Sequence, residues 1–129
     1  WQLAPLAPQT YALRMDAALD FAAAAEFERA IVESLARQPD IRHVCLFAQA
    51  INRIDATGVD TFAKLRVQLG VRGITLHLSG VKLPVETALR RAGALDAGPW
   101  LEQYRTDAEA LAALSRLAVL PDDIAAAAI

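Results

Sequence analysis

Cysteine is almost absent from this sequence. Cys45 is the single one, so no disulfide can form within the chain. It stands between Val44 and Leu46 in an apolar run, where we expect a buried, unreactive thiol. The lack of disulfides agrees with a reducing compartment but does not prove one, since many exported bacterial proteins also lack them.

Long apolar runs are absent as well. The apolar residues come in short runs such as 21–25 and 44–48, far below the roughly 18 residues needed to cross a bilayer. Residues 1–9 lack the basic flank, apolar stretch and small-residue cleavage site of a secretory signal. We therefore expect a soluble segment that is not exported. The length of 129 residues, with 55% hydrophobic residues, is enough to form the core of one domain.

Aromatic residues are scarce, at 6%, and the net charge is only −2. The charge is uneven, because residues 53–91 carry seven basic and three acidic side chains while the segments on either side are acidic. A nucleic-acid-binding domain usually has a larger basic excess with interleaved aromatic residues. We therefore expect no nucleic-acid partner.

The first half of the chain shows strand and helix patterns in turn. Residues 10–15 alternate like a strand, and we expect residues 16–18 to turn and residues 19–21 to pair back, forming an opening β-hairpin. Apolar residues recur every fourth position from Ala23 to Leu35, which predicts an amphipathic helix. The apolar run from Val44 to Ala48 predicts a central strand covered on both faces.

The second half continues the alternation. It predicts a helix with Val59, Phe62, Leu65 and Leu69 inward, a strand at 74–78, a helix from Pro84 to Gly93, a short strand at 104–105 and a last helix. We expect Thr106 and Glu109 to form the capping box of that last helix, with Leu111, Leu114 and Ala118 inward. The order predicts an α/β domain with a mixed, mostly parallel central sheet of four to five strands and about four helices.

One junction carries a family resemblance. Ile54-Asp55-Ala56-Thr57-Gly58 joins a strand end to a helix start, and Gly73-Ile74-Thr75-Leu76-His77-Leu78-Ser79-Gly80-Val81 follows further on. These motifs resemble the STAS domain shared by anti-sigma factor antagonists and SulP anion permeases, over roughly residues 10–118. The segments Val81-Lys82-Leu83-Pro84-Val85 and Leu89-Arg90-Arg91-Ala92-Gly93 are more similar to the permease branch.

The resemblance implies a domain division and a function. It implies a linker at 1–9 that follows a membrane domain, a STAS domain at 10–119 and a tail at 120–129. Such a domain would be a non-catalytic regulatory part of a bacterial SulP-type transporter of sulfate, bicarbonate or dicarboxylate, on the cytoplasmic side of the inner membrane. The implied partners are its own membrane domain, a second STAS domain in a dimer, acyl-carrier protein or a regulatory protein. The alternative is a free-standing anti-sigma factor antagonist.

Asp55, Thr57 and Gly58 form the candidate site. The resemblance places a phosphoacceptor at Thr57, and a helix N-terminus suits an anion. Thr57 to Asp60 also has the pattern of a capping box, in which Thr57 only binds the backbone of its own helix. Asp55 is expected either to orient the loop through backbone hydrogen bonds or to contact a partner.

Four further residues are candidates for phosphate or partner contacts: Arg53, Lys64, Ser79 and Lys82. The alternative for the three basic residues is an ordinary solvated face, and for Ser79-Gly80 a tight turn. The resemblance also allows weak nucleotide binding, and we expect no other cofactor. Trp100 is expected either to anchor a partner or to seal the edge of the core.

Catalytic motifs are not found. The sequence has no nucleophile elbow and no acid and base at a recognisable spacing, so we expect no enzyme and no catalytic residue. His43 and His77 lie far apart in the sequence, without the Cys pair or Glu/His spacing of a zinc site. We expect no metal and two ordinary, partly buried histidines.

Overall fold

The structure is a computed structural model, which describes residues 9–14 and 21–116. Within these residues, four strands form one sheet in the order β1-β2-β3-β4, and the three pairings between them are all parallel. The strands are β1 (Thr10–Arg14), β2 (His43–Phe47), β3 (Thr75–Ser79) and β4 (Leu101–Tyr104). The fold is therefore the expected α/β class, and within the described residues the sheet is parallel throughout.

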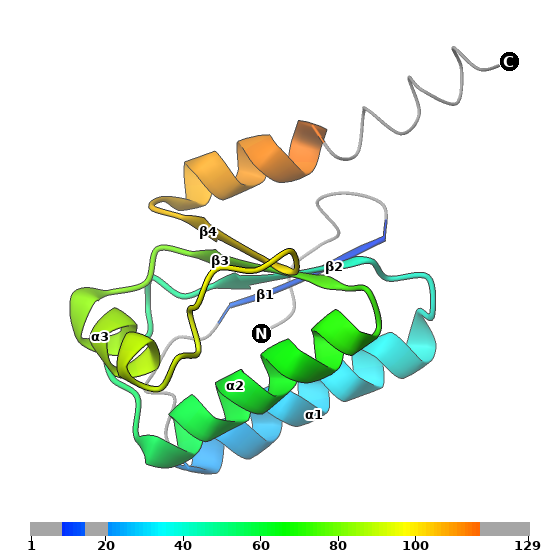
Figure 1. Cartoon of the computed structure of the whole chain (residues 1–129). Coiled ribbons are helices and arrows are strands. Elements are labelled where there is room, and N and C mark those ends of the chain that lie inside the picture. Colours follow the sequence, from blue (N-terminus) through cyan, green and yellow to red (C-terminus); the bar gives the residue numbers. More distant parts are fainter. Residues whose placement is uncertain (1–8, 15–20, 117–129) are drawn as a thin grey trace, which may run out of the picture.

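Helices cover both faces of this sheet (Figure 1). Helices α1 (Phe21–Arg37) and α2 (Ala56–Val71) lie on one face, and the helix formed by residues 107–116 lies on the other. Helix α3 (Leu83–Arg91) is placed at the end of the sheet where the strands finish. Because the strands are parallel in the order β1-β2-β3-β4 and such crossovers are right-handed, the helices of the first two crossovers, α1 and α2, lie on the same face.

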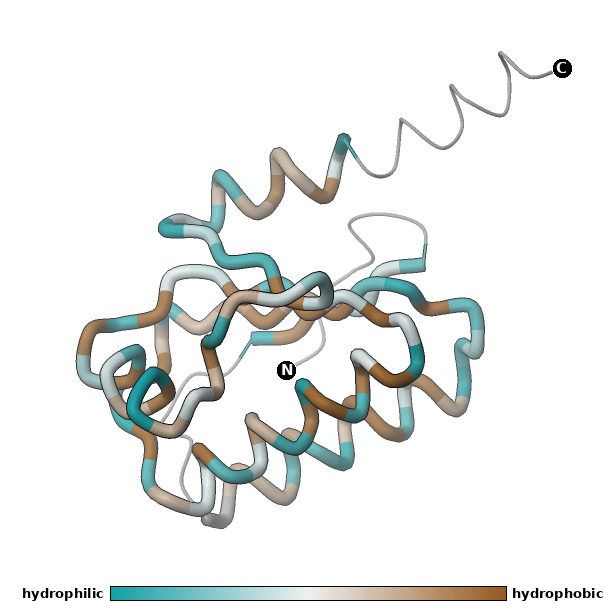
Figure 2. Tube along the Cα trace, in the orientation of Figure 1, coloured by the Kyte–Doolittle hydropathy of each residue, from teal (hydrophilic) through white to brown (hydrophobic). Residues whose placement is uncertain are grey.

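The larger core fills the space between the sheet and helices α1 and α2. The buried stripe of α1 contains Phe27, Ile31 and Leu35, and that of α2 contains Phe62, Leu65 and Leu69, as the periodicity predicts. Figure 2 shows apolar and hydrophilic residues interspersed along both helices. With the helical repeat, each helix therefore has one face for the core and one for solvent.

A smaller core lies on the other face of the sheet. Ala110 and Leu114 from the helix at 107–116 pack on Ala12, Cys45 and Phe47 from the strands. The expectation that Leu111 points inward is wrong, since Leu111 is 39% exposed and Ala110 is fully buried. Alanine at this position lets the helix approach the strands closely. The third predicted inward residue, Ala118, is outside the described residues.

The predicted opening hairpin meets the same boundary. Its turn and most of its second strand, residues 16–20, are outside the described residues. Its last residue, Phe21, begins helix α1, and β1 pairs in parallel with β2, so a strand ending at Phe21 is wrong. The physical reason is that residues 21–25 continue the apolar repeat of α1, and an alternation of three residues is too short to outweigh a helix of this length.

The helix ends follow local rules. Helix α2 closes in a Schellman motif, in which Ile74 N donates to Leu69 O at 2.8 Å and Gly73 N donates to Gly70 O at 3.0 Å. Gly73 has a φ of +71°, which favours glycine. At the other end of the chain, Glu109 N donates to Thr106 Oγ1 at 3.2 Å, and the Glu109 carboxylate accepts from Arg105 N at 3.1 Å. The predicted capping pair is therefore present, with its return bond one residue earlier than expected.

Candidate functional site

The head of helix α2 is the structural context of the candidate site. Strand β2 leads through a turn, closed by Ile51 N donating to Ala48 O at 3.0 Å, into an exposed segment at 52–53. Asp55 is the N-cap residue in extended conformation, and its Oδ1 accepts a hydrogen bond from Gly58 N at 2.8 Å. The carboxylate thus satisfies one of the free N–H groups at the positive end of the helix.

The interpretation of Thr57 as a capping residue is wrong. Asp55 is the cap, which makes Thr57 the second residue of the helix, and its side chain is exposed. Asp60, its predicted partner, instead forms an ion pair with Lys64 at 2.9 Å on the outer face of α2. The interpretation of Asp55 as an acceptor of backbone hydrogen bonds is confirmed.

The other candidates divide into two groups. Arg53 is exposed beside Asp55, and Lys82 Nζ donates to Asn52 Oδ1 at 2.6 Å, so both belong to the head of α2. Lys64 lies two turns further along α2 and is 70% exposed. Ser79 is fully buried and donates to Asp107 Oδ1 at 2.5 Å, on the side of the sheet that carries the helix at 107–116. Lys64 and Ser79 therefore do not join the site.

Thr57 and Asp55 occupy different positions at the head of α2. The exposed hydroxyl of Thr57 lies in the first turn, and the carboxylate of Asp55 already takes the nearby N–H group of Gly58. Across residues 9–14 and 21–116, no three His, Cys, Asp or Glu side chains are grouped so that they could hold a metal ion. The same part of the chain contains no helix that is both long and apolar enough to span a membrane.

A model of the STAS domain family matches residues 4–110. The chain belongs to the STAS domain family. Solved structures with the same fold include a sulfate transporter family protein from Wolinella succinogenes, at 22% identity and a TM-score of 0.72, with 89% of this chain and 90% of that chain covered. No curated protein sequence matches the chain significantly.

Two further structures share the fold of this STAS domain. The anti-sigma factor antagonist SpoIIAA in its unphosphorylated form is 18% identical, with a TM-score of 0.64, and 89% of this chain and 96% of that chain are covered. The murine anion transporter Slc26a9 is 15% identical, with a TM-score of 0.61, over 74% of this chain and 16% of that much longer chain. At these identities the likenesses establish the fold alone.

The sequence reasoning missed a hydrogen-bonded chain of rings in the STAS domain. His43 Nδ1 lies 3.0 Å from His77 Nε2, and His77 Nδ1 lies 2.9 Å from the hydroxyl of Tyr104. The three residues come from the adjacent strands β2, β3 and β4, on the face opposite to α1 and α2. His77 is only 2% exposed. Burial is the main cause that lowers its pKa to about 4, and the nearby His43 lowers it further. Burial also lowers the pKa of His43.

The thiol of the STAS domain has the expected character. Cys45 is fully buried in the smaller core. Burial, with a further contribution from the Asp107 carboxylate, raises its pKa to about 12. The thiolate is therefore negligible at neutral pH, and Cys45 is inert in the folded STAS domain.

We expect the cap at Asp55 to stabilise the STAS domain measurably. Replacing Asp55 with Ala leaves Gly58 N without its acceptor, and the free energy of unfolding should fall by about 1 kcal/mol. Asp55→Asn keeps a side-chain oxygen at the same place and should retain most of that stability. Urea unfolding followed by circular dichroism measures both. Equal losses in the two variants would contradict the capping role.

Proposed function

We propose that the chain is a non-catalytic regulatory domain of a SulP-type anion transporter, on the cytoplasmic side of a bacterial inner membrane. Membership of the STAS family supports a regulatory role. The likeness to a sulfate transporter family protein over most of both chains is consistent with the transporter branch. Transport of sulfate, bicarbonate or dicarboxylate belongs to the membrane portion of such a protein.

The observation that carries this proposal is the cap at the head of α2. A phosphate on Thr57 would be a strong acceptor for the free N–H groups of the first turn, but the Asp55 carboxylate already binds Gly58 N there. Asp60 adds a second carboxylate one turn along the helix. Because like charges repel an added phosphate, the site suits a constitutive docking surface better than a phosphorylation switch.

Regulation would follow from differential contact. The domain changes transport only if it binds one conformational state of the membrane portion more tightly than another. The surface at Arg53, Asp55 and Lys82 carries both signs of charge and is exposed, apart from the Lys82 bond to Asn52. Such a surface favours specificity of docking over raw affinity.

The gene that encodes this chain tests the proposal directly. We expect the reading frame upstream of Trp1 to encode a series of apolar segments of about 20 residues each. In proteoliposomes, removal of residues 10–119 from that full-length protein should change the rate of sulfate, bicarbonate or dicarboxylate uptake. A reading frame without membrane-spanning segments would refute the assignment.

The second candidate is an anti-sigma factor antagonist that is controlled by phosphorylation. The observation that favours it is the exposed Thr57 in the first turn of α2, together with the shared fold of SpoIIAA. In that case Thr57→Glu abolishes binding to an anti-sigma kinase while Thr57→Ala retains it.

For the transporter assignment we expect a different outcome at Thr57. The Thr57→Glu and Thr57→Ala variants should differ by less than about twofold in binding any kinase of this type from the same genome, because Thr57 is no phosphoacceptor. Phosphate incorporation from labelled ATP, analysed by mass spectrometry of the peptide that contains Thr57, completes the test. Stoichiometric phosphothreonine at Thr57 would support the antagonist instead.

A further inference from the structure

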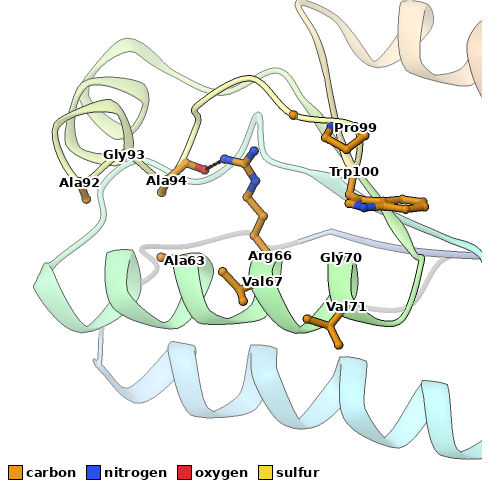
Figure 3. A pocket seen from close by; sticks show the side chains of 11 residues that line it. Ala63, Arg66, Val67, Gly70, Val71, Ala92, Gly93, Ala94, Pro99 and Trp100 are labelled. Atoms are coloured by element: carbon orange, nitrogen blue, oxygen red, sulfur yellow. Dashed lines mark hydrogen bonds between the residues drawn. The ribbon is translucent and has the colours of Figure 1, made fainter.

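An apolar groove runs between helix α2 and the segment that joins α3 to β4 (Figure 3). Its volume is about 600 Å³. One side is formed by residues from α2, namely Ala63, Val67, Gly70 and Val71. The other side is formed by Ala92, Pro99 and Trp100. This groove is distinct from the head of α2, where the candidate site lies.

The walls of the groove are held in place. Arg66 Nη1 donates to Ala94 O at 2.9 Å, and the same guanidinium binds Asp96 O, which ties the α3–β4 segment to α2. Trp100 packs directly on Gly70, where a Cβ atom would lie 3.2 Å from Trp100 Cδ1. The groove is therefore preformed, which lowers the entropic cost of binding.

Exposed apolar side chains line it. Val67 is 65% exposed, Val71 is 83% exposed and Trp100 is 41% exposed. The two valines are four residues apart on α2, on the side away from the buried stripe that contains Leu65 and Leu69. Large apolar side chains that lie together on a surface usually mark an interaction site.

The backbone around the groove offers little to an extended partner. The peptide groups of α2 are bonded within the helix, and Ala94 O is taken by Arg66. Trp100 O accepts from Leu76 N at 2.9 Å, and Pro99 has no N–H group. An added strand needs free main-chain donors and acceptors, whereas a helix satisfies its own. The groove therefore suits a helix.

The charges near the groove are mostly positive. Arg72 follows Val71 at one end, and Arg91 precedes Ala92 at the other. Both arginines are exposed, and neither has a side-chain partner within the described part of the chain. Asp96, whose carboxylate lies beside Gly93, is the opposing charge on this segment and is outnumbered. Such ends complement acidic residues on a partner.

We propose that this groove binds the apolar face of an amphipathic helix from a protein partner, with acidic residues at both ends of that face. The proposal does not depend on the transporter assignment, because it concerns this chain alone. An anionic membrane surface also attracts apolar and basic side chains. Here, however, the apolar residues lie on the two sides of a groove of about 600 Å³, and a groove of this kind accepts inserted side chains of a helix.

A synthetic peptide tests the proposal. The probe is a helical peptide of about 15 residues with leucines at helical spacing on one face and glutamates at both ends of that face. Trp1→Phe leaves Trp100 as the only tryptophan, so its fluorescence reports on the groove. We expect saturable binding with a blue shift of Trp100, and binding about tenfold weaker or more for Val71→Glu.

Matched controls locate the binding. Leu83→Glu places the same charge at another exposed apolar residue, 74% exposed and outside the groove, and should leave the affinity unchanged. The double variant Arg72→Glu, Arg91→Glu should have a lower affinity for the peptide with glutamates at its ends. It should have a higher affinity for a version with lysines at those positions. Thermal unfolding by circular dichroism verifies that the variants fold.

Several results would overturn the proposal. The first is absence of binding at millimolar peptide, or equal binding of a peptide with the same composition and scrambled leucines. The second is a Trp100 shift with vesicles of phosphatidylglycerol and phosphatidylcholine but not with the peptide, which would indicate a membrane surface. The third is self-association in sedimentation equilibrium that Val71→Glu abolishes, which would identify a second copy as the occupant.

Discussion

Between pH 7 and pH 4, the free energy of unfolding should fall by about 3 kcal/mol more in the native sequence than in a His77→Gln variant. The folded pKa of His77 is about 4, against an ordinary value of 6.5. Because the folded pKa is depressed, the unfolded chain binds the proton first as the pH falls. Stability is therefore complete above pH 6.5 and is lost progressively towards pH 4.

The groups that face His77 determine why it resists protonation. His43 lies on β2, Tyr104 and Glu102 lie on β4, and Arg116 lies on the helix at 107–116, all around one cavity on this face of the sheet. Burial is the larger cause of the low pKa, and His43 adds to it because two imidazolium ions cannot share the hydrogen bond between them. The hydrogen bond between the two rings requires that at least one of them is neutral.

Urea unfolding at a series of pH values measures this effect. Titration of carboxylates changes stability in both proteins alike, so the difference between them isolates the histidine. His43→Gln serves as the comparison, because His43 is partly exposed and should produce a smaller pH dependence. Parallel stability curves for the native sequence and His77→Gln would contradict a buried, neutral His77.

Truncation of Phe62 should have an equal or larger effect at any pH. Phe62 is 1% exposed and lies on the buried stripe of α2, in the second turn after Asp55. Phe62→Ala should lower the free energy of unfolding by about 3 to 5 kcal/mol, through lost apolar burial and the cavity left behind. Small domains are stable by about 5 to 15 kcal/mol, so this loss is a large part of the total stability. At room temperature an appreciable fraction of the molecules should then be unfolded.

Two variants control for this interpretation. Phe62→Leu keeps most of the volume and should cost less than about 1.5 kcal/mol. Val67→Ala removes apolar atoms from the same helix at an exposed position, and should change stability by about 0.5 kcal/mol or less. Chemical denaturation gives all three values. A loss at Val67 comparable to that at Phe62 would show that the two faces of α2 are wrongly assigned.

The elements of the fold could be predicted because their apolar patterns are local. The stripes of α1 and α2, the run at Val44 to Ala48 and the stop at Gly93 each depend on residues within one or two turns or a single strand. The prediction of an opening hairpin was wrong at Phe21, because three residues contain too little periodicity to distinguish a strand from the start of a helix. Leu111 failed because an alanine, Ala110, fills the buried position.

The candidate site was predicted in place but not in detail. The sequence places Asp55, Thr57 and Gly58 at a helix start, and both Thr57 and Asp55 have side chains that cap helices. Only the position of the first helical residue decides between them, and such boundaries are uncertain by one or two residues. The contacts of Ser79 with Asp107 and of His43 with His77 join different strands or helices, so they depend on packing that no local pattern contains.

One wall of the groove, on α2, corresponds to a local pattern in the sequence. Val67 and Val71 stand four residues apart and out of phase with the buried stripe, which is the pattern of a second apolar face. The clamp from Arg66 to the α3–β4 segment spans 28 residues to Ala94, so the wall opposite these valines could not be predicted.

The edge of the sheet at β4 has a consequence for the behaviour of the chain in concentrated solution. This strand has only four residues, and Glu102 and Gln103 in its middle are exposed. A short edge with a charge discourages strands of neighbouring molecules from extending the sheet. A protein with 55% hydrophobic residues is thereby protected against amyloid-like stacking at this edge of the described sheet.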